Sequence, residues 1–163
     1  SNIVYGLQDC MYLGNLNAKR DWGHARDYVE MQWLMLQQDK PEDYVIATGQ
    51  TYSVKEFFEK SCKYLGYDIE FEGNGINEIG RIQNINNPRV TDNKLKVGDV
   101  IIRVDSKYFR PTEVDVLIGD PLKAKKDLNW IPKTSLNDLV EEMMDSDLKN
   151  ALKDKTLREK GLK

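Results

Sequence analysis

The sequence has 163 residues, a length typical of one domain, and 40% of them are hydrophobic, which is enough for a core. A formal net charge of −3 argues against nonspecific nucleic-acid binding, which needs a basic face. No apolar stretch approaches the roughly 18 residues of a membrane-spanning helix, and the first residues lack the blocks of a signal peptide. We therefore expect a cytoplasmic protein with neither nucleic acid nor membrane as a partner, in which residues 1–2 are typical of a tag remnant.

The sequence contains two cysteines and one histidine. Cys10 and Cys62 are too few for a disulfide framework and too isolated for a metal site, so no metal-binding residue is predicted. Cys62 lies in an apolar helical pattern and is expected in the core, whereas Cys10 is expected to be a reduced, partly buried thiol. Both thiols fit a cytoplasmic location.

The first third of the chain predicts two strands and one helix. Residues 11–15 (MYLGN) read as a short buried strand, and a helix follows over about 25–38. Apolar residues, Trp33 among them, cover a wide face of this helix, so it is expected to be well buried. Residues 44–48 (YVIAT) are a continuous apolar run, typical of a strand covered on both faces.

The middle of the chain contains the clearest helix signal. Ser53 and Glu56 form a capping box, and Gly66 is expected to end the helix that this box opens. Residues 68–72 alternate between polar and apolar side chains and predict a strand. Residues 73–98 contain glycines and asparagines without periodicity, so they are predicted to form a long variable loop.

The last third predicts one strand followed by two helices. Residues 100–105 form the strand, and 108–115 are expected to be irregular because a proline biases the residue before it away from helix. Asp120-Pro121 predicts an N-cap with proline at the first helical position. Ser135 caps a final amphipathic helix, and the polar tail over 149–163 is expected to fray. The order of elements predicts an α/β fold.

A cluster of charged residues, KRDWGHARDYV at 19–29, stands directly before the first predicted helix. Arg20 suits a phosphate group, because a guanidinium offers a planar fork of donors and keeps its charge. A helix N-terminus nearby adds to that attraction. The alternative is a surface arginine paired with Asp21 or Asp27.

Two neighbours of Arg20 also have alternative roles. His24 is a candidate general base or ligand, but a lone histidine at a helix start is more often a structural hydrogen-bond partner. Trp22 is either a core residue, which is the commoner case, or a platform on which a ligand stacks.

A second polar cluster, FRPTE at 109–113, places Arg110 and Glu113 three residues apart around a proline-stiffened turn. Such a pair could bind a diphosphate with the arginine and ribose hydroxyls with the carboxylate. The alternative is a salt bridge between them that closes the loop. No G-x-G-x-x-G, P-loop or G-x-S-x-G motif occurs, and no tyrosine has a lysine four residues later. The residues alone therefore predict a binding surface with no catalytic and no cofactor-binding residue.

Four segments carry a family resemblance: LGNLNAKRDWGHARDYVEMQWLMLQQDKPEDYVIATG (13–49), YSVKEFFE (52–59), VGDVIIRVDSKYFRPTEVDVLIGDPLKAKKDLNWIPK (97–133) and SLNDLVEEMMDSDL (135–148). They resemble the C-terminal portion of GDP-mannose 4,6-dehydratases. The succession of RDWGHA, YVIATG and YFRPTEVD separates this family from the other nucleotide-sugar enzymes of the extended short-chain dehydrogenase group. Residues 73–96 match poorly, and the tail hardly matches at all.

The resemblance implies a Rossmann domain that carries a smaller C-terminal substrate domain. Members of the family use tightly bound NADP to oxidise C4 of the mannose, remove water across C5 and C6 with a glutamate base, and return the hydride to C6. The product is GDP-4-keto-6-deoxymannose, and the catalytic residues and glycine motif lie in the N-terminal half. Residues 1–163 are therefore expected to be a single C-terminal α/β substrate-binding region, a fragment that lacks the dinucleotide-binding half and is inactive by itself.

The resemblance also implies a set of substrate-binding residues. Arg20 and Arg110 match arginines that contact the GDP diphosphate, and Glu113 matches the acid on the ribose. Asn15 and Lys19 match the edge of the nucleotide pocket. No catalytic residue is carried over.

The resemblance further implies partners for the chain. Asp21 is expected to position Arg20 for GDP-mannose. The missing N-terminal Rossmann half would cover apolar faces of the chain, so without it we expect a homo-oligomer. Two alternatives stay open. One is a fragment of another nucleotide-sugar epimerase, dehydratase or reductase, and the other is a stand-alone nucleotide-sugar binding module without catalysis.

Overall fold

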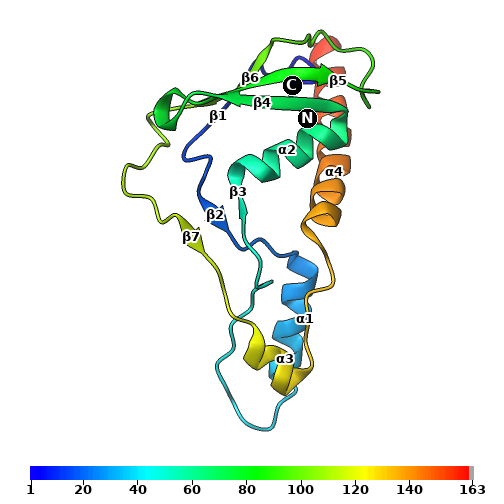
Figure 1. Ribbon diagram of the computed structural model, residues 1–163. Helices are drawn as coiled ribbons and strands as arrows, with labels where there is room; N and C mark the ends of the chain where they lie inside the picture. The colour runs from blue at the N-terminus through cyan, green and yellow to red at the C-terminus, as the bar shows by residue number, and fades with distance from the viewer. Residues whose placement is uncertain (162–163) are drawn as a thin grey trace.

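The computed structural model describes residues 1–161 and shows an elongated molecule with two lobes (Figure 1). The upper lobe contains a four-stranded sheet and two helices, and the lower lobe contains two further helices with their loops. A narrow three-stranded ribbon lies between the lobes. Strands and helices thus combine as the α/β prediction requires.

The strands of the upper sheet lie in the order β1-β6-β5-β4. They are β1 (Met11–Leu13), β4 (Tyr67–Glu72), β5 (Ile79–Ile85) and β6 (Val100–Val104). β1 is parallel to β6, whereas the other neighbours are antiparallel. The strands predicted at 11–15, 68–72 and 100–105 are therefore confirmed, with small changes at their ends.

The loop predicted over residues 73–98 is wrong for its first half. β5 pairs with β4 on one side and with β6 on the other, and the 3-10 helix η1 (Gly75–Asn77) lies in the connection between β4 and β5. Gly80 and Ile82 are buried, but most of the strand is polar or only half-buried. Pairing with β4 and β6, more than its own apolar side chains, defines β5 as a strand. The hydrophobic periodicity of the sequence therefore does not reveal this strand. Residues 86–98 contain no helix or strand, as expected.

Two capped helices share a core with this sheet: α2 (Val54–Leu65) and α4 (Leu136–Glu159). Each begins after a serine whose hydroxyl accepts from the third helical N–H, while the acidic residue there accepts from the serine N–H. α2 ends at Gly66, which has a left-handed backbone with φ of 92°. The capping prediction at Ser53 and the cap at Ser135 are therefore confirmed. The buried core side chains of this lobe include Leu16, Cys62, Leu65, Tyr67, Ile82, Ile102 and Val140.

Both cysteines are free and buried. Burial raises the pKa of the Cys62 thiol to about 12 and also raises the pKa of Cys10. Cys62 lies in the core of the upper lobe, as its helical pattern predicts, and Cys10 is more buried than expected. Neither side chain is placed to react as a thiolate at neutral pH.

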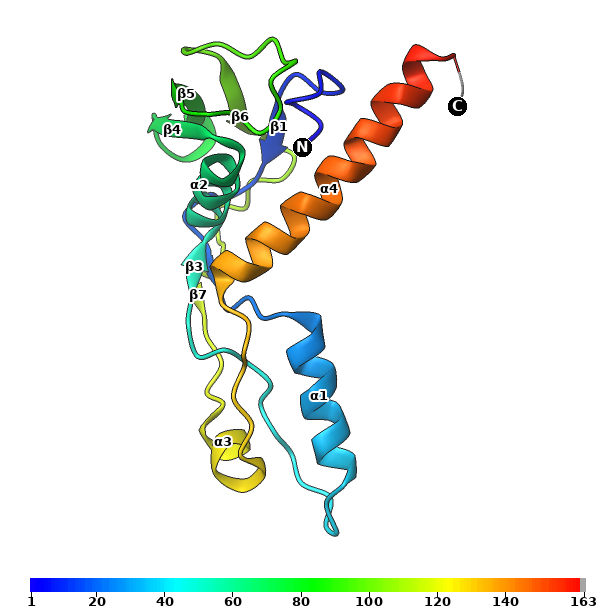
Figure 2. The same cartoon turned by 90° about the vertical axis from the view of Figure 1, so that its right-hand side faces the viewer.

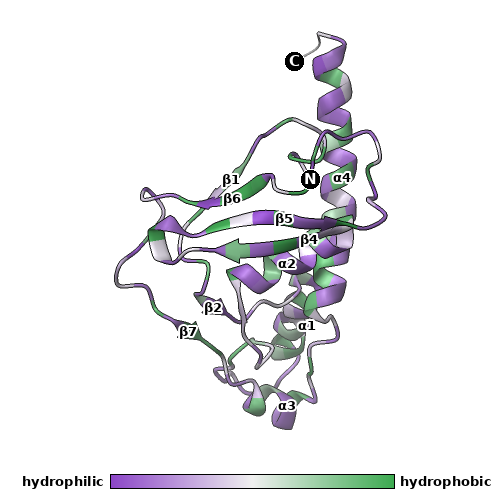
Figure 3. Ribbon diagram, turned by 45° about the horizontal axis from the view of Figure 1, so that its top comes forward, coloured by the Kyte–Doolittle hydropathy of each residue, from purple (hydrophilic) through white to green (hydrophobic). Residues whose placement is uncertain are grey.

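The frayed tail predicted over 149–163 is wrong as far as the structure describes it, because α4 continues to Glu159. Ala151 is only 2% exposed, so the inner face of the helix extends past the expected end. Lys155 donates to the Asp92 carboxylate at 3.3 Å. Figure 2 shows the helix passing diagonally beside the sheet, and Figure 3 shows its later turns mainly hydrophilic. A narrow apolar stripe that continues from Met144 through Leu148 to Ala151 lies on the inner face of α4, and such a stripe is hard to see in a polar sequence.

The lower lobe is held by one buried carboxylate. α1 (Ala25–Leu36) and α3 (Leu122–Leu128) share a small core of Met31, Ala124 and Trp130. Asp27 is 3% exposed, and its Oδ2 accepts from the backbone N–H groups of Lys133 and Thr134 at 3.0 and 2.9 Å. The Trp130 indole donates to the Asp27 carbonyl at 3.1 Å. Burial raises the pKa of the Asp27 carboxyl, but these hydrogen bonds outweigh burial and hold it below its usual value.

The ends of these two helices differ slightly from the prediction. α1 stops at Leu36, two residues before the expected end. Pro121 is the N-cap of α3 instead of its first helical residue, and the Asp120 carboxylate accepts from the Leu122 N–H at 2.9 Å. Asn129 ends α3 with a left-handed backbone.

The strand predicted at 44–48 is wrong, because within residues 1–161 this segment has no regular secondary structure and pairs with no strand. Ala47 is buried, whereas Val45 is exposed. The buried face predicted for α1 is also only partly present, since Trp33 is 59% exposed and Leu36 is exposed as well. An apolar run indicates burial but does not supply the neighbour that a strand needs.

A narrow ribbon connects the lobes. Its strands, in the order β3-β2-β7, are β3 (Tyr52–Ser53), β2 (Lys19–Arg20) and β7 (Val116–Leu117). β2 is antiparallel to β3 and parallel to β7. None of the three was predicted, because each has only two residues. Within residues 1–161 no helix has the length and hydropathy to cross a membrane.

Asp27→Ala should lower the free energy of unfolding by about 2–3 kcal/mol, because two N–H groups at a buried position lose their acceptor. The depressed pKa means that the carboxylate contributes stability above the unfolded value near 4 and loses it as the pH falls through the folded value. Urea unfolding at pH 7 and at about pH 3 checks this: the gap between wild type and variant should narrow in acid. Asp39→Ala, at an exposed loop carboxylate, is the matched control. Equal stability of both variants at pH 7 would contradict the role of Asp27.

Candidate functional site

Four of the residues predicted to bind substrate, Asn15, Arg20, Arg110 and Glu113, come together beside the ribbon. Asn15 follows β1, Lys19 and Arg20 form β2, and the loop before β7 carries Arg110 and Glu113. The parallel pairing of β2 with β7 brings these two distant segments side by side, since Lys19 faces Val116 in the register. The sequence spacing between the segments gives no sign of this pairing.

Arg20 is held by protein groups through three hydrogen bonds. Its Nη2 lies 2.7 Å from Glu113 Oε1 in an ion pair, and its Nη1 donates to the carbonyls of Lys19 and Val114 at 2.7 and 2.8 Å. The side chain is 25% exposed. A guanidinium has five N–H groups, so two remain for another acceptor.

Glu113 uses only one of its two oxygens for close contacts. Oε1 accepts from Arg20 and from the Val114 N–H at 3.0 Å. Oε2 lies 4.0 Å from Arg110 Nη1, and the Arg110 side chain is 77% exposed. The salt bridge between Arg110 and Glu113 considered as an alternative is therefore long, and the close partner of Glu113 is Arg20. Oε2 has room to accept further hydrogen bonds.

Asn15 and Lys19 border the same group. The Asn15 amide donates to the Arg110 carbonyl and accepts from the Arg110 N–H, both at 2.8 Å. The Lys19 N–H donates to the Asp115 carbonyl at 2.7 Å, and its side chain is exposed. The geometry therefore links two arginines and a carboxylate through their side chains, whereas Lys19 meets this group only through its backbone.

Asp21 does not position Arg20, contrary to the expectation from sequence. Its Oδ1 accepts from the Thr48 N–H and hydroxyl at 2.8 and 2.6 Å, and its Oδ2 accepts from the Gly49 N–H at 2.9 Å. The alternative pairing of Arg20 with Asp21 or Asp27 is also wrong. The carboxylate of Asp21 instead holds the turn at Thr48 and Gly49. The Thr-Gly pair itself is the sequence signal for this turn.

His24 and Trp22 are structural residues. His24 is the N-cap of α1, and its Nδ1 accepts from the Arg26 N–H at 2.9 Å. Its Nε2 lies 3.3 Å from the Glu142 carboxylate. The Trp22 ring packs edge-on against Phe57, with centroids 4.9 Å apart, beside the upper core. The hydrogen-bonding and core interpretations of these residues are therefore supported over a base and a stacking platform.

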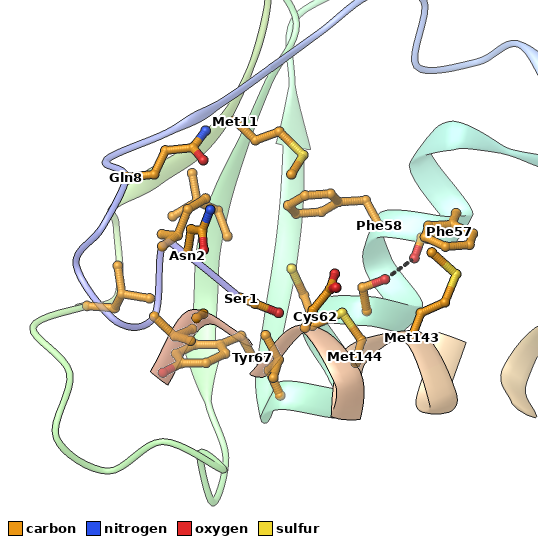
Figure 4. Close-up of a pocket in the computed structure, with 18 of the residues that line it drawn as sticks. Ser1, Asn2, Gln8, Met11, Phe57, Phe58, Cys62, Tyr67, Met143 and Met144 are labelled. Atoms are coloured by element: carbon orange, nitrogen blue, oxygen red, sulfur yellow. Dashed lines mark hydrogen bonds between the residues drawn. The ribbon is translucent and has the colours of Figure 1, made fainter. Parts of the chain in front are cut away.

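Two cavities lie away from this group. One, of about 560 Å³, is lined mainly by apolar side chains of the N-terminal segment, α2 and α4 (Figure 4). Its charged side chains are Asp147 and Asp154, which repel a phosphate. The other, of about 640 Å³, borders the turn at Thr48. None of the five predicted residues lines either cavity. Within residues 1–161 no group of three metal-ligating side chains gathers.

Solved structures share this fold. RMD from Pseudomonas aeruginosa, complexed with NADPH, has a TM-score of 0.60 and 14% identity, over 88% of this chain and 38% of that chain. A putative epimerase from Burkholderia cenocepacia has a TM-score of 0.64 and 18% identity, over 89% and 38%. The fold is therefore that of part of an extended Rossmann-type short-chain dehydrogenase.

Sequence relatives define the family more closely. The model of the family described as GDP-mannose 4,6 dehydratase matches residues 1–143. A GDP-mannose 4,6-dehydratase of Yersinia enterocolitica is 52% identical over 161 residues, which are 99% of this chain and 43% of the relative. The human enzyme of that name is 51% identical over 148 residues, 91% and 37%. The chain belongs to the GDP-mannose 4,6-dehydratase family, and it spans about two fifths of the length of the curated relatives it matches.

Asp21→Ala should destabilise the ribbon, because three donors around the Thr48–Gly49 turn lose their acceptor. We expect a loss of about 2–3 kcal/mol in unfolding free energy. Chemical denaturation followed by tryptophan fluorescence measures it. Asp43→Ala, which removes an exposed carboxylate from the preceding loop, should change stability by less than about 0.5 kcal/mol. A D21A variant as stable as D43A would show that the turn does not need this carboxylate.

Proposed function

We propose that the chain is the substrate-binding part of a GDP-mannose 4,6-dehydratase and binds the GDP portion of GDP-mannose at the ribbon. The complete enzyme would convert GDP-mannose to GDP-4-keto-6-deoxymannose. The observation that supports this proposal is the convergence of Arg20, Arg110 and Glu113 from segments about ninety residues apart. Family membership supplies the substrate, and the geometry supplies groups whose chemistry suits it.

The charges of the group suit a nucleoside diphosphate. Arginine binds phosphate oxygens through a fork of charged donors. Arg110 offers an exposed guanidinium, and Arg20 offers its two remaining N–H groups from a fixed position. Glu113 would accept from ribose hydroxyls through Oε2 while Oε1 continues to hold Arg20. Asn15 and Lys19 would lie at the edge of this nucleotide site.

The reaction itself needs groups outside these 163 residues. The sequence contains neither the glycine-rich motif that binds a dinucleotide phosphate nor the tyrosine–lysine spacing of the catalytic pair. We therefore propose that NADP, which supplies hydride transfer, and the catalytic residues belong to the Rossmann half of the enzyme. The chain alone would bind nucleotide without dehydratase activity. A cytoplasmic location fits this role and the two buried thiols.

Arg20→Ala and Arg110→Ala should each weaken GDP binding to this chain by about 2 kcal/mol, or roughly thirtyfold, because each removes charge-assisted hydrogen bonds. Isothermal titration with GDP measures the change, and added salt should weaken wild-type binding because Arg110 is exposed. Arg26→Ala is the matched control, since Arg26 is an exposed arginine that contacts Glu142 away from the ribbon. GDP affinity that is unchanged in both R20A and R110A would refute the proposed site.

The exposed apolar face of the lower lobe suits a protein partner. Isolated apolar side chains are normal on a surface, but a contiguous group indicates an interface. Five apolar residues of the lower lobe, here called the lower apolar face, are more than half exposed: Val29, Trp33 and Leu36, which share one face of α1 by their spacing, and Val45 and Leu122. We propose that the Rossmann half covers it in the complete enzyme and that a second copy covers it when the chain is alone.

The 163-residue chain should therefore self-associate. Sedimentation velocity over a concentration series should show a species larger than the 18.9 kDa monomer. Trp33→Lys should shift the distribution towards monomer, because a charge at the interface costs desolvation. Ile76→Lys, at an exposed apolar residue of the upper lobe, should leave the sedimentation distribution unchanged. A non-associating wild-type monomer would contradict the prediction.

A further inference from the structure

The segment that follows β1 lies directly against the turn that carries Arg110. The Asp105 N–H donates to the Leu13 carbonyl at 2.9 Å, which continues the pairing of β1 with β6 beyond the strands. At Gly14 a Cβ would collide with the backbone oxygen of Tyr108. Only glycine allows so close an approach of the two backbones.

Asn15 then binds the backbone of Arg110 through both ends of its amide. Nδ2 donates to the Arg110 carbonyl and Oδ1 accepts from the Arg110 N–H, each at 2.8 Å. The side chain thus replaces the neighbour that a strand would provide. Pro111 follows and has no N–H of its own, so its fixed φ adds stiffness without needing a partner.

The backbone of Arg110 is therefore fixed, whereas its guanidinium group is exposed. The Arg110 side chain is 77% exposed, and within residues 1–161 its one ion-pair partner is Glu113 at 4.0 Å. A long side chain loses less entropy on binding when its backbone is already held. Asn15 directs its amide to the protein, so its contribution to a ligand at Arg110 would be indirect.

We propose that Asn15 is a positioning residue, which holds Arg110 for the diphosphate and does not itself contact the nucleotide. This inference rests on the proposed function. Asn15→Ala should weaken GDP binding about fivefold to tenfold, in keeping with loss of the two hydrogen bonds that fix Arg110. In the Arg110→Ala background the same change should alter affinity by less than about twofold, because the group that Asn15 holds is gone.

The decisive experiment is the double-mutant cycle N15A, R110A and N15A/R110A, titrated with GDP by calorimetry. Asn17→Ala is the matched control, since Asn17 is exposed and its side chain makes no hydrogen bond among the described residues. Amide hydrogen exchange of Arg110, followed by NMR without ligand, provides a second readout. It should accelerate in N15A and not in N17A, because only N15A removes the acceptor of that N–H.

The outcomes separate the two proposals. Non-additive losses in the cycle together with faster Arg110 exchange support the positioning role. Additive losses, with N15A weakening GDP binding equally in both backgrounds, overturn it and indicate direct contact of Asn15 with the nucleotide. Unchanged Arg110 exchange in N15A also overturns it, whatever the affinities are. Wild-type binding that R110A and R20A leave unaffected refutes the proposed function itself, and the positioning role for the nucleotide falls with it.

Discussion

The arrangement of the two lobes depends on the hydrogen bonds that the Asp21 carboxylate accepts. The chain passes repeatedly between the lobes, and the ribbon that joins them has strands of only two residues. So short a ladder provides few hydrogen bonds, and Asp21 adds contacts from the segment beside β2 to Thr48 and Gly49, with Gly119 N–H at 3.4 Å. One side chain thereby connects three passages of the chain. The residues that could bind a nucleotide are attached to this junction, so its geometry sets theirs.

The pair Arg20–Glu113 has two effects on a ligand. It fixes the guanidinium before a ligand arrives, which reduces the entropy lost on binding. The Glu113 carboxylate also neutralises part of the positive charge that a phosphate would meet. A partly exposed pair of this kind contributes little to stability by itself. Its value lies in orientation, because the two carbonyls of Lys19 and Val114 hold the same guanidinium from another side. Arg110 has the opposite character, with a fixed backbone and an exposed head.

The local signals in the sequence predicted local structure well. Ser53 with Glu56, Gly66 and Ser135 define helix ends through contacts within a few residues, and the structure has them where expected. Features that depend on distant neighbours were not predictable in the same way. Residues 44–48 have the composition of a strand without a neighbour, while β5 has two neighbours and a weak pattern.

The candidate site follows the same rule. The resemblance implied five candidate residues, and the contacts among four of them join distant parts of the chain: Glu113 lies 93 positions after Arg20, and Arg110 lies 95 after Asn15. Proximity in sequence therefore offered Asp21 or Asp27 as the ion-pair partner of Arg20, whereas the partner in the structure is Glu113. The partner of a charged side chain depends on strand register, here β2 against β7, which a pattern of residues does not contain.

The parallel pairing of β1 with β6 has a consequence for the order of folding. Met11 faces Ile102, so this contact closes a loop of about ninety residues. The hairpin β4–β5 closes within a few residues and brings in β6 as its next neighbour along the chain. We expect the hairpin and α2 to form early and β1 to add last, at the edge of a nearly complete sheet. The loop that carries Arg110 and Glu113, which packs against the segment after β1, would then be the last part of the molecule to acquire its shape.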